Sequence, residues 1–135
     1  MKASICPAMP RILPTLTLDY LRRSAQNSFL YVEELTFHKG SESKPFIECD
    51  VNCVIDGVLT IGEAKSADRL DQNRGREAAI IEGYQSLAAS IGARRVVFAT
   101  QAKSWDSTTA RKIQQVFGND SLDVRLLTEI ELVKT

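Results

Sequence analysis

The chain has 135 residues, a length that suits one compact domain and is too short for two of ordinary size. Hydrophobic residues make up 44% of it and charged residues 25%, which is typical of a soluble globular protein and excludes collagen-like, mucin-like and wholly disordered chains. The 17 basic residues balance 17 acidic ones, which excludes a strongly basic nucleic-acid-binding domain. Any contact with nucleic acid must therefore depend on a local site.

The sequence predicts a cytoplasmic protein with no membrane contact. No apolar run approaches the roughly 20 residues of a membrane-spanning helix, and prolines interrupt the region after Met1, which excludes a secretory signal. Cys49 and Cys53 lie in one predicted strand with their Cα atoms roughly 13 Å apart, too far for a disulfide, so we expect them to be small core residues. Cys6 is expected to be a surface thiol. With His38 as the single histidine, a structural zinc site is excluded.

The first half of the chain predicts one helix and three strands. Residues 1–16 contain three prolines and no periodicity, so we expect an extended lead-in or linker before a single domain over residues 17–135. A helix is expected from Leu16 to Asn27, with Thr17 as its cap. Strands follow over residues 29–37, 47–55 and 58–64. Asp56–Gly57 joins the last two, because both residues tolerate the positive φ of a tight hairpin turn.

The second half alternates helices and strands. The spacing of apolar residues predicts a helix from Glu77 to Ile91, ended by Gly92, and a helix from Ser107 to Phe117, ended by Gly118. Short strands are expected over residues 96–99 and 123–127. A three-strand meander followed by helix–strand crossovers predicts an α/β fold with a mixed central sheet flanked by helices.

The hairpin around Asp56–Gly57 carries the candidate site. If these two residues form the whole loop, Asp50 lies opposite Glu63. Two residues further along each strand, Glu48 lies opposite Lys65. Because side chains alternate along a strand, all four project from one face, and the other face is apolar core. Opposed carboxylates repel each other unless a cation lies between them. Mg²⁺ binds one or two carboxylates together with water and phosphate oxygens, so the set fits phosphodiester hydrolysis.

This arrangement resembles the PD-(D/E)xK nuclease superfamily, whose members share the restriction-endonuclease-like fold. Asp50 matches the acidic residue of the second strand, and Glu63-Ala64-Lys65 matches the (Asp/Glu)-x-Lys motif of the third. The order of elements over residues 17–100 also matches the family core. The resemblance implies a nuclease that uses Mg²⁺, or Mn²⁺ in its place, held by Asp50, Glu63 and the carbonyl of Ala64, with Lys65 assisting the attacking water. It implies nucleic acid as the partner, DNA in the first place, and products with 5′-phosphate and 3′-hydroxyl ends.

Further acidic residues are candidates for auxiliary roles. Some family members contribute another carboxylate from the first helix or strand, and Asp19, Glu33 and Glu34 are the candidates here. Since Glu33 and Glu34 face opposite sides of their strand, at most one of them reaches the site. We expect Glu34 and Glu48 to be auxiliary residues.

Gln85 and Arg69 are candidates for substrate binding. Gln85 lies on the apolar stripe of its predicted helix, where a polar residue is unexpected. It could contact the substrate, and the alternative is a core glutamine that is hydrogen-bonded to the backbone. It directly follows Tyr84, whereas some family members carry the glutamine before the tyrosine. Arg69 follows Lys65 in a polar segment that also contains Arg74 and Arg76. These arginines could bind phosphates, and the alternative is that their side chains are simply solvated. Trp105 is expected to be a packing residue.

Several functional alternatives stay open. A second Glu-x-Lys, Glu42-Ser43-Lys44, lies in a polar segment without a hairpin partner, so it is not expected to form the site. A non-catalytic nucleic-acid-binding or assembly module of the same fold would have a similar sequence. A small-molecule-binding α/β domain is disfavoured, because no glycine-rich phosphate loop follows a predicted strand. Since the domain is small and neutral, we expect a homo-oligomer or a part of a larger protein or complex.

Overall fold

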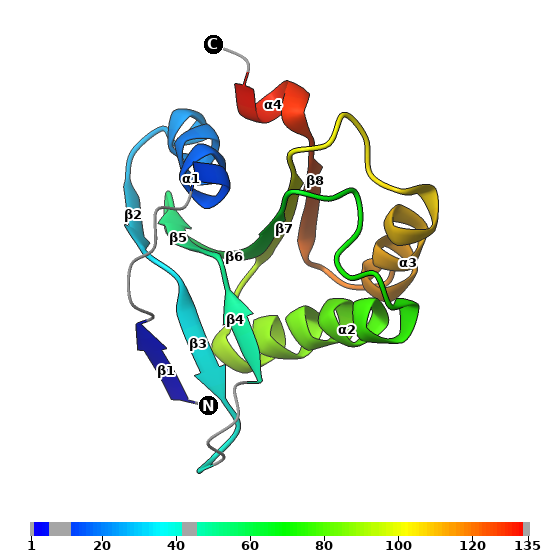
Figure 1. The fold of residues 1–135 in the computed structure, drawn as a ribbon. Helices are drawn as coiled ribbons and strands as arrows, with labels where there is room; N and C mark the ends of the chain where they lie inside the picture. The colour runs from blue at the N-terminus through cyan, green and yellow to red at the C-terminus, as the bar shows by residue number, and fades with distance from the viewer. Residues whose placement is uncertain (1, 6–11, 42–45, 134–135) are drawn as a thin grey trace.

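The computed structural model describes residues 2–5, 12–41 and 46–133 (Figure 1). Within these ranges the strands are β1 (Lys2–Ile5), β2 (Phe29–Val32), β3 (Leu35–His38), β4 (Ile47–Cys49), β5 (Val51–Ile55), β6 (Val58–Lys65), β7 (Arg95–Thr100) and β8 (Asp123–Leu127). The helices are α1 (Ile12–Ser24), α2 (Arg74–Ile91), α3 (Ser107–Phe117) and α4 (Glu129–Val133).

The central sheet has five strands in the order β2-β5-β6-β7-β8. β2, β5 and β6 run antiparallel, whereas β6, β7 and β8 run parallel, so the sheet is mixed, as predicted. α1 and α4 cover one face, where Leu21 and Leu132 enter the core. α2 and α3 cover the other face, where Tyr84 and Ile113 enter a second core (Figure 1). The predicted α/β class, with helices on both faces of a mixed sheet, is confirmed.

The predicted tight turn joins β5 to β6. Asp56 (φ 50°) and Gly57 (φ 82°) both have positive φ. The strands pair from Ile55–Val58 to Val51–Gly62, which is the register that a two-residue loop predicts. The Asp56 carboxylate also accepts hydrogen bonds from the backbone N–H groups of residues 26–28, at 2.6–2.9 Å. These bonds lower the pKa of Asp56 and attach the turn to the segment after α1.

Two of the predicted strands are each broken at one point. The strand predicted over residues 29–37 is divided between β2 and β3, and the strand predicted over residues 47–55 bends at Asp50. β3 and β4 leave the central sheet there and pair with β1 in a separate three-stranded sheet. Glu48 therefore pairs with Thr36 and not with Lys65. The predicted Glu48–Lys65 pairing was wrong, because the bend ends the β5–β6 ladder first.

Buried Asn52 connects the two broken strands. Its side-chain amide donates to the Cys49 carbonyl at 2.8 Å and to the Glu33 carbonyl at 3.3 Å. The first bond spans the bend at Asp50, and the second reaches the break between β2 and β3. Since both contacts use the same amide group, Asn52 couples the two bends.

The bend also redistributes the predicted core face. Cys49 packs in the core beside α2, whereas Val51 and Cys53 pack in the core beside α1. Their predicted grouping on one face was wrong, because the chain turns between Cys49 and Val51. Helices cover both faces of the central sheet, as predicted, and leave Glu63 only 7% exposed. Cys49 and Cys53 are free and buried, which confirms them as core thiols; Cys6 lies outside the described residues.

The N-terminal region differs from the predicted lead-in. Lys2–Ile5 forms strand β1, and α1 already begins at Ile12. Pro14 is accommodated because it lies in the first helical turn, where a missing N–H costs no intrahelical bond. Thr17 is buried inside the helix, and its hydroxyl donates to the Leu13 carbonyl at 2.8 Å. Thr17 therefore does not cap the helix, and that prediction was wrong.

The later elements follow the predictions closely. α2 begins at Arg74, earlier than predicted, because the Asn73 side chain accepts from the Arg76 N–H and caps it. Gly92 ends α2 with φ 75°, as predicted. α3 and β8 have their predicted bounds, and Gly118 ends α3, with right-handed φ and ψ.

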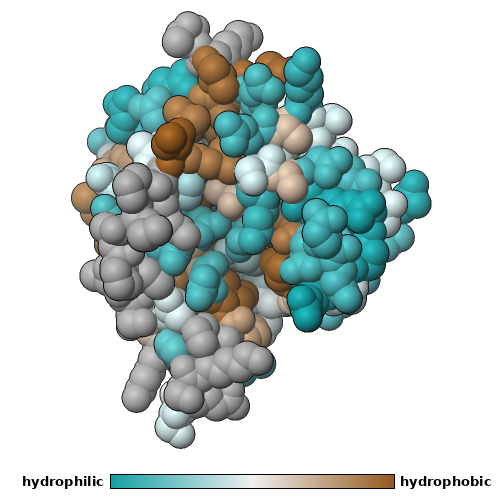
Figure 2. Space-filling model, in the orientation of Figure 1, coloured by the Kyte–Doolittle hydropathy of each residue, from teal (hydrophilic) through white to brown (hydrophobic). Residues whose placement is uncertain are grey.

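Helix α4 was not predicted from the sequence. It begins after Thr128, whose N–H and hydroxyl both donate to the Glu131 carboxylate, at 2.8 and 2.7 Å. α4 packs against α1, and brown apolar side chains gather at the top of Figure 2, where these two helices lie. Ile12 and Ile130 are among the exposed apolar residues. In the parts of the chain that the structure describes, no helix has the length and apolar character needed to cross a membrane.

Replacing Asn52 tests whether its amide holds the bend. Asn52→Ala removes the donors to the Cys49 and Glu33 carbonyls, so the free energy of unfolding should fall by about 1–3 kcal/mol. Urea denaturation measures it, with exposed Asn119→Ala as the control, for which we expect almost no change. Equal losses for the two variants would show that the Asn52 bonds do not stabilise the bend.

Candidate active site

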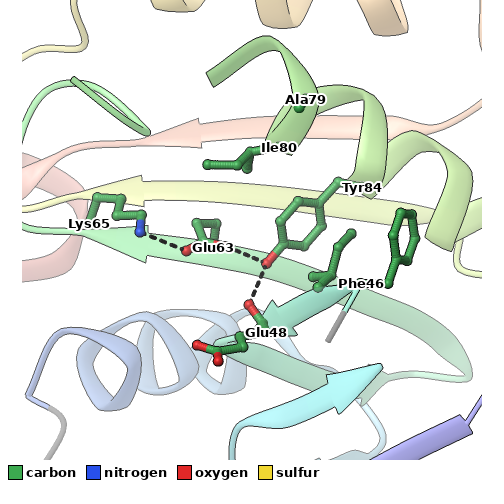
Figure 3. Close-up of a pocket in the computed structure, with 8 residues that line it drawn as sticks. Phe46, Glu48, Glu63, Lys65, Ala79, Ile80 and Tyr84 are labelled. Atoms are coloured by element: carbon green, nitrogen blue, oxygen red, sulfur yellow. Dashed lines mark hydrogen bonds and ion pairs between the residues drawn. The ribbon is translucent and has the colours of Figure 1, made fainter. Parts of the chain in front are cut away.

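Glu63 lies near the end of β6, where α2 crosses the sheet. Its Oε1 atom is 3.2 Å from the Lys65 ammonium nitrogen, and its Oε2 atom accepts a hydrogen bond from the Tyr84 hydroxyl at 2.6 Å (Figure 3). Glu63 and Lys65 project on the same side of β6 because they are two residues apart. The Lys65 side chain is 38% exposed, compared with 10% for that of Glu63. The ion pair thus connects a buried carboxylate to solvent.

Asp50 reaches β6 through its side chain at the point where the backbone ladder ends. Its Oδ2 atom accepts a hydrogen bond from the Ala64 N–H at 3.0 Å. β5 pairs with β6 only as far as Val51–Gly62, so the Asp50 carboxylate takes the place of a backbone acceptor. The structure therefore brings Asp50, Glu63 and Lys65 together around Ala64.

The Glu63 carboxyl is held in an environment that disfavours its charge. Burial and the nearby negative charge of Asp50 together raise its pKa to about 7, while Lys65 and Tyr84 act in the opposite direction. Opposed carboxylates were predicted to repel each other, and the raised pKa reflects that repulsion together with desolvation. A cation placed between the two carboxylates would favour the charged form of Glu63.

Tyr84 is a member of the site that the sequence did not identify. It is fully buried on α2, and its hydroxyl lies 3.0 Å from the Gly62 carbonyl as well as 2.6 Å from Glu63. A hydroxyl has one hydrogen, so it cannot donate to both acceptors at once. If Glu63 carries a proton, its carboxyl group donates a hydrogen bond to the Tyr84 hydroxyl. The Tyr84 hydroxyl is then free to donate its own hydrogen to the Gly62 carbonyl, so both contacts are hydrogen bonds. This geometry agrees with the raised pKa of Glu63.

A cavity of about 440 Å³ opens beside these groups (Figure 3). Its lining combines charged groups of the site with apolar side chains from the segment around β4 and from α2. The lining residues are Phe46, Ile47, Glu48, Glu63, Lys65, Ala79, Ile80 and Tyr84. Glu48 thus reaches the same cavity as Lys65, although the two residues lie in different sheets.

The predicted auxiliary carboxylates lie near the break in the strands. Glu34 is half-buried between β2 and β3, and extending either flanking ladder places it opposite Asp50. Glu33 is exposed. Asp19 lies apart from this region on α1, where it pairs with Arg22 at 2.8 Å.

The predicted substrate-binding residues have structural contacts elsewhere. The Gln85 amide donates to the Val116 carbonyl at 2.9 Å and to Asp120 at 2.8 Å, so it links α2 to the end of α3. The Nε atom of Arg69 lies 3.9 Å from the Oδ1 atom of Asp106, at the start of α3. Neither Gln85 nor Arg69 belongs to the described residues that line the cavity. The alternative of a glutamine bonded to backbone therefore describes Gln85 better.

The remaining polar candidates also have structural roles. Arg74 pairs with buried Glu77 at 2.8 Å and with Asp106 at 2.9 Å, which joins the start of α2 to the start of α3. The Trp105 indole donates to the Leu127 carbonyl at 3.1 Å and packs against the core. The predicted packing role of Trp105 is confirmed. Glu42-Ser43-Lys44 lies outside the described residues.

The oxygen donors of the site suit Mg²⁺ better than zinc. Over residues 2–5, 12–41 and 46–133, no group of three or more His, Cys, Asp or Glu side chains is arranged to hold a metal ion. Asp50, Glu63 and the Ala64 carbonyl offer two carboxylates and a backbone oxygen. Mg²⁺ commonly takes one or two carboxylates and completes its shell with water and phosphate oxygens, whereas structural zinc takes four Cys or His ligands. The donor set therefore fits a hydrated Mg²⁺ ion.

No protein-family model, curated protein or solved structure matches this chain.

The raised pKa of Glu63 predicts how stability varies with pH. Between its ordinary value of 4.5 and about 7, the folded protein keeps a proton that the unfolded chain releases. The free energy of unfolding should therefore fall as pH rises through this range and level off above it. Glu63→Gln removes the dependence and should stabilise the metal-free protein by about 1–3 kcal/mol at pH 8.

Urea denaturation in EDTA from pH 4.5 to 8 measures this effect. Glu48→Gln is the matched control, since Glu48 lines the same cavity but is exposed, and it should follow the wild-type curve. Parallel curves for wild type and Glu63→Gln would show that Glu63 does not retain a proton in the folded protein.

Proposed function

We propose that this protein is a metal-dependent nuclease that hydrolyses phosphodiester bonds, with DNA as the favoured substrate. The proposal depends mainly on one observation: the Asp50 carboxylate, bonded to the Ala64 N–H at 3.0 Å, lies beside a Glu63 carboxylate that pairs with Lys65 at 3.2 Å. An acidic pair with an adjacent ammonium group is the combination that the Glu63-Ala64-Lys65 motif predicts. The mixed α/β fold with helices on both faces agrees with it.

Asp50, Glu63 and the Ala64 carbonyl would hold the Mg²⁺ ion. When bound, the ion polarises the phosphate and makes water a stronger nucleophile at neutral pH. The raised pKa of Glu63 supports this assignment, because burial and the Asp50 charge both oppose ionisation without a cation. Tyr84 holds the Oε2 side of Glu63 and is a positioning residue, because it reaches the site through that carboxylate.

Lys65 acts on the chemical step in this proposal. Its ammonium group contacts Glu63 and also faces the cavity where a substrate phosphate can enter. From there it orients the attacking water and stabilises the negative charge that develops on the phosphate. Positioned electrostatic groups of this kind typically contribute about 10²–10³ to the rate.

The surface available for recognition is small. The chain is neutral overall, so non-specific attraction to the phosphate backbone is weak. A second copy of the chain, or a larger protein that contains this domain, would supply further contacts to the substrate.

Single-turnover cleavage with parallel metal titration separates the two roles. Lys65→Ala should reduce cleavage about 10²–10³-fold while metal binds as well as in the wild type or better, because a competing cation is gone. Asp50→Ala should lose both metal binding and cleavage, and EDTA should abolish wild-type cleavage. Lys44→Ala, in the second Glu-x-Lys, is the matched control and should change neither.

Two results would count against the proposal. Wild-type cleavage in Lys65→Ala together with loss in Lys44→Ala would mean that the other Glu-x-Lys forms the site. If the wild type cleaves neither DNA nor RNA with Mg²⁺ or Mn²⁺, a non-catalytic module of this fold becomes the better description.

A further inference from the structure

The cavity beside Glu63 continues past the charged groups along an apolar wall. Phe46 and Ile47 form one part of this wall, and Ala79 and Ile80 of α2 form another. In Figure 3, Lys65 and Phe46 lie on opposite sides of Tyr84. The cavity therefore has an ionic end, at Glu63 and Lys65, and an aromatic end. Metal binding and water activation need only the ionic end.

The apolar wall depends on close contact between α2 and the start of β4. A Cβ atom on Gly83 would lie 3.0 Å from the Ile47 Cδ1 atom and 3.9 Å from the Phe46 ring. The absence of a side chain at Gly83 thus lets both residues approach the helix. The Lys39 ammonium nitrogen lies 4.2 Å from the centre of the Phe46 ring, which places a second cation at the aromatic end.

We propose that the apolar wall binds a nucleobase whose phosphate lies at Lys65, so that the site takes single strands or frayed ends and not an intact duplex. This inference depends on the proposed nuclease function. Bases of a single strand stack readily on aromatic side chains, and 440 Å³ falls within the size range of ordinary ligand cavities. A base inside a duplex is stacked and paired, so it must leave the helix to enter.

The charges around the wall fit a nucleotide better than a purely apolar ligand. Lys65 at one end and Lys39 at the other attract phosphates. Glu48 turns its backbone carbonyl toward Tyr84, at 3.5 Å from the hydroxyl, and its exposed carboxylate away from it (Figure 3).

Fluorescence anisotropy with labelled oligonucleotides tests the base site separately from cleavage. The probes are oligo-dC, oligo-dT and a blunt duplex of equal length, with Ca²⁺ in place of Mg²⁺. The wild type should bind oligo-dC and oligo-dT more tightly than the duplex, because only unpaired bases can stack on the wall. Phe46→Ala should weaken oligo-dC binding about tenfold, because one stacked base is lost, and Phe46→Trp should restore it.

Two further variants guard against effects on folding. Ala79 is exposed on α2 and lines the cavity, so Ala79→Glu places a negative charge at the wall without removing core packing. It should also weaken oligo-dC binding at least tenfold. Tyr31, an exposed aromatic residue on β2, is the matched control, and Tyr31→Ala should bind like the wild type.

The possible outcomes separate this inference from the proposed nuclease function. Binding that depends on Phe46 and Ala79 without any cleavage would support the base site and count against the nuclease. Metal-dependent cleavage with unchanged binding in Phe46→Ala and Ala79→Glu would overturn the base site and leave the nuclease standing. Equal binding of duplex and single strands by the wild type would also overturn it, as would no binding of any probe.

Discussion

The hydrogen bond from the Ala64 N–H to the Asp50 carboxylate is the interaction on which the site depends. At this point the β5–β6 ladder ends, β4 turns away, and a side chain replaces the backbone as the partner of β6. The same bend leaves the Gly62 carbonyl open to the Tyr84 hydroxyl. It also makes room for the cavity between α2 and the start of β4. One local break in a hairpin thus creates both the acidic pair and the space beside it.

The bend has an electrostatic consequence as well. It holds Asp50 next to a carboxylate that is almost fully buried, so Glu63 is destabilised as an anion. Lys65 offsets part of this repulsion from the solvent side, and Tyr84 donates a hydrogen bond from the core side. The repulsion between Asp50 and Glu63 that remains in the metal-free protein favours binding of a divalent cation. The paired carboxylates that lower the stability of the fold are therefore the groups expected to bind the metal.

The sequence predicts the parts of the fold that have strong local signals. Asp56–Gly57 determines the hairpin register, and the helical spacing with Gly92 determines most of α2. The break at Asp50 has no glycine or proline to mark it, and the polar residue that holds it, Asn52, lies inside an otherwise apolar strand. Tyr84 lies on the apolar stripe of α2 and so has the pattern of an ordinary core residue. Its hydrogen bond to Glu63 becomes visible only when the helix is placed over the sheet. The cavity depends on tertiary contacts of Phe46 that no local pattern encodes.

Calorimetric titration of Mn²⁺ at pH 7.5 into the wild type, Asp50→Asn and Glu48→Gln tests the central claim most directly. Asn keeps an oxygen that can accept from Ala64, so the bend is retained while the charge is lost. We expect a single site in the wild type, at least tenfold weaker binding in Asp50→Asn, and wild-type affinity in Glu48→Gln. Equal affinity in the wild type and Asp50→Asn, or no binding to the wild type, would contradict a metal site formed by Asp50 and Glu63.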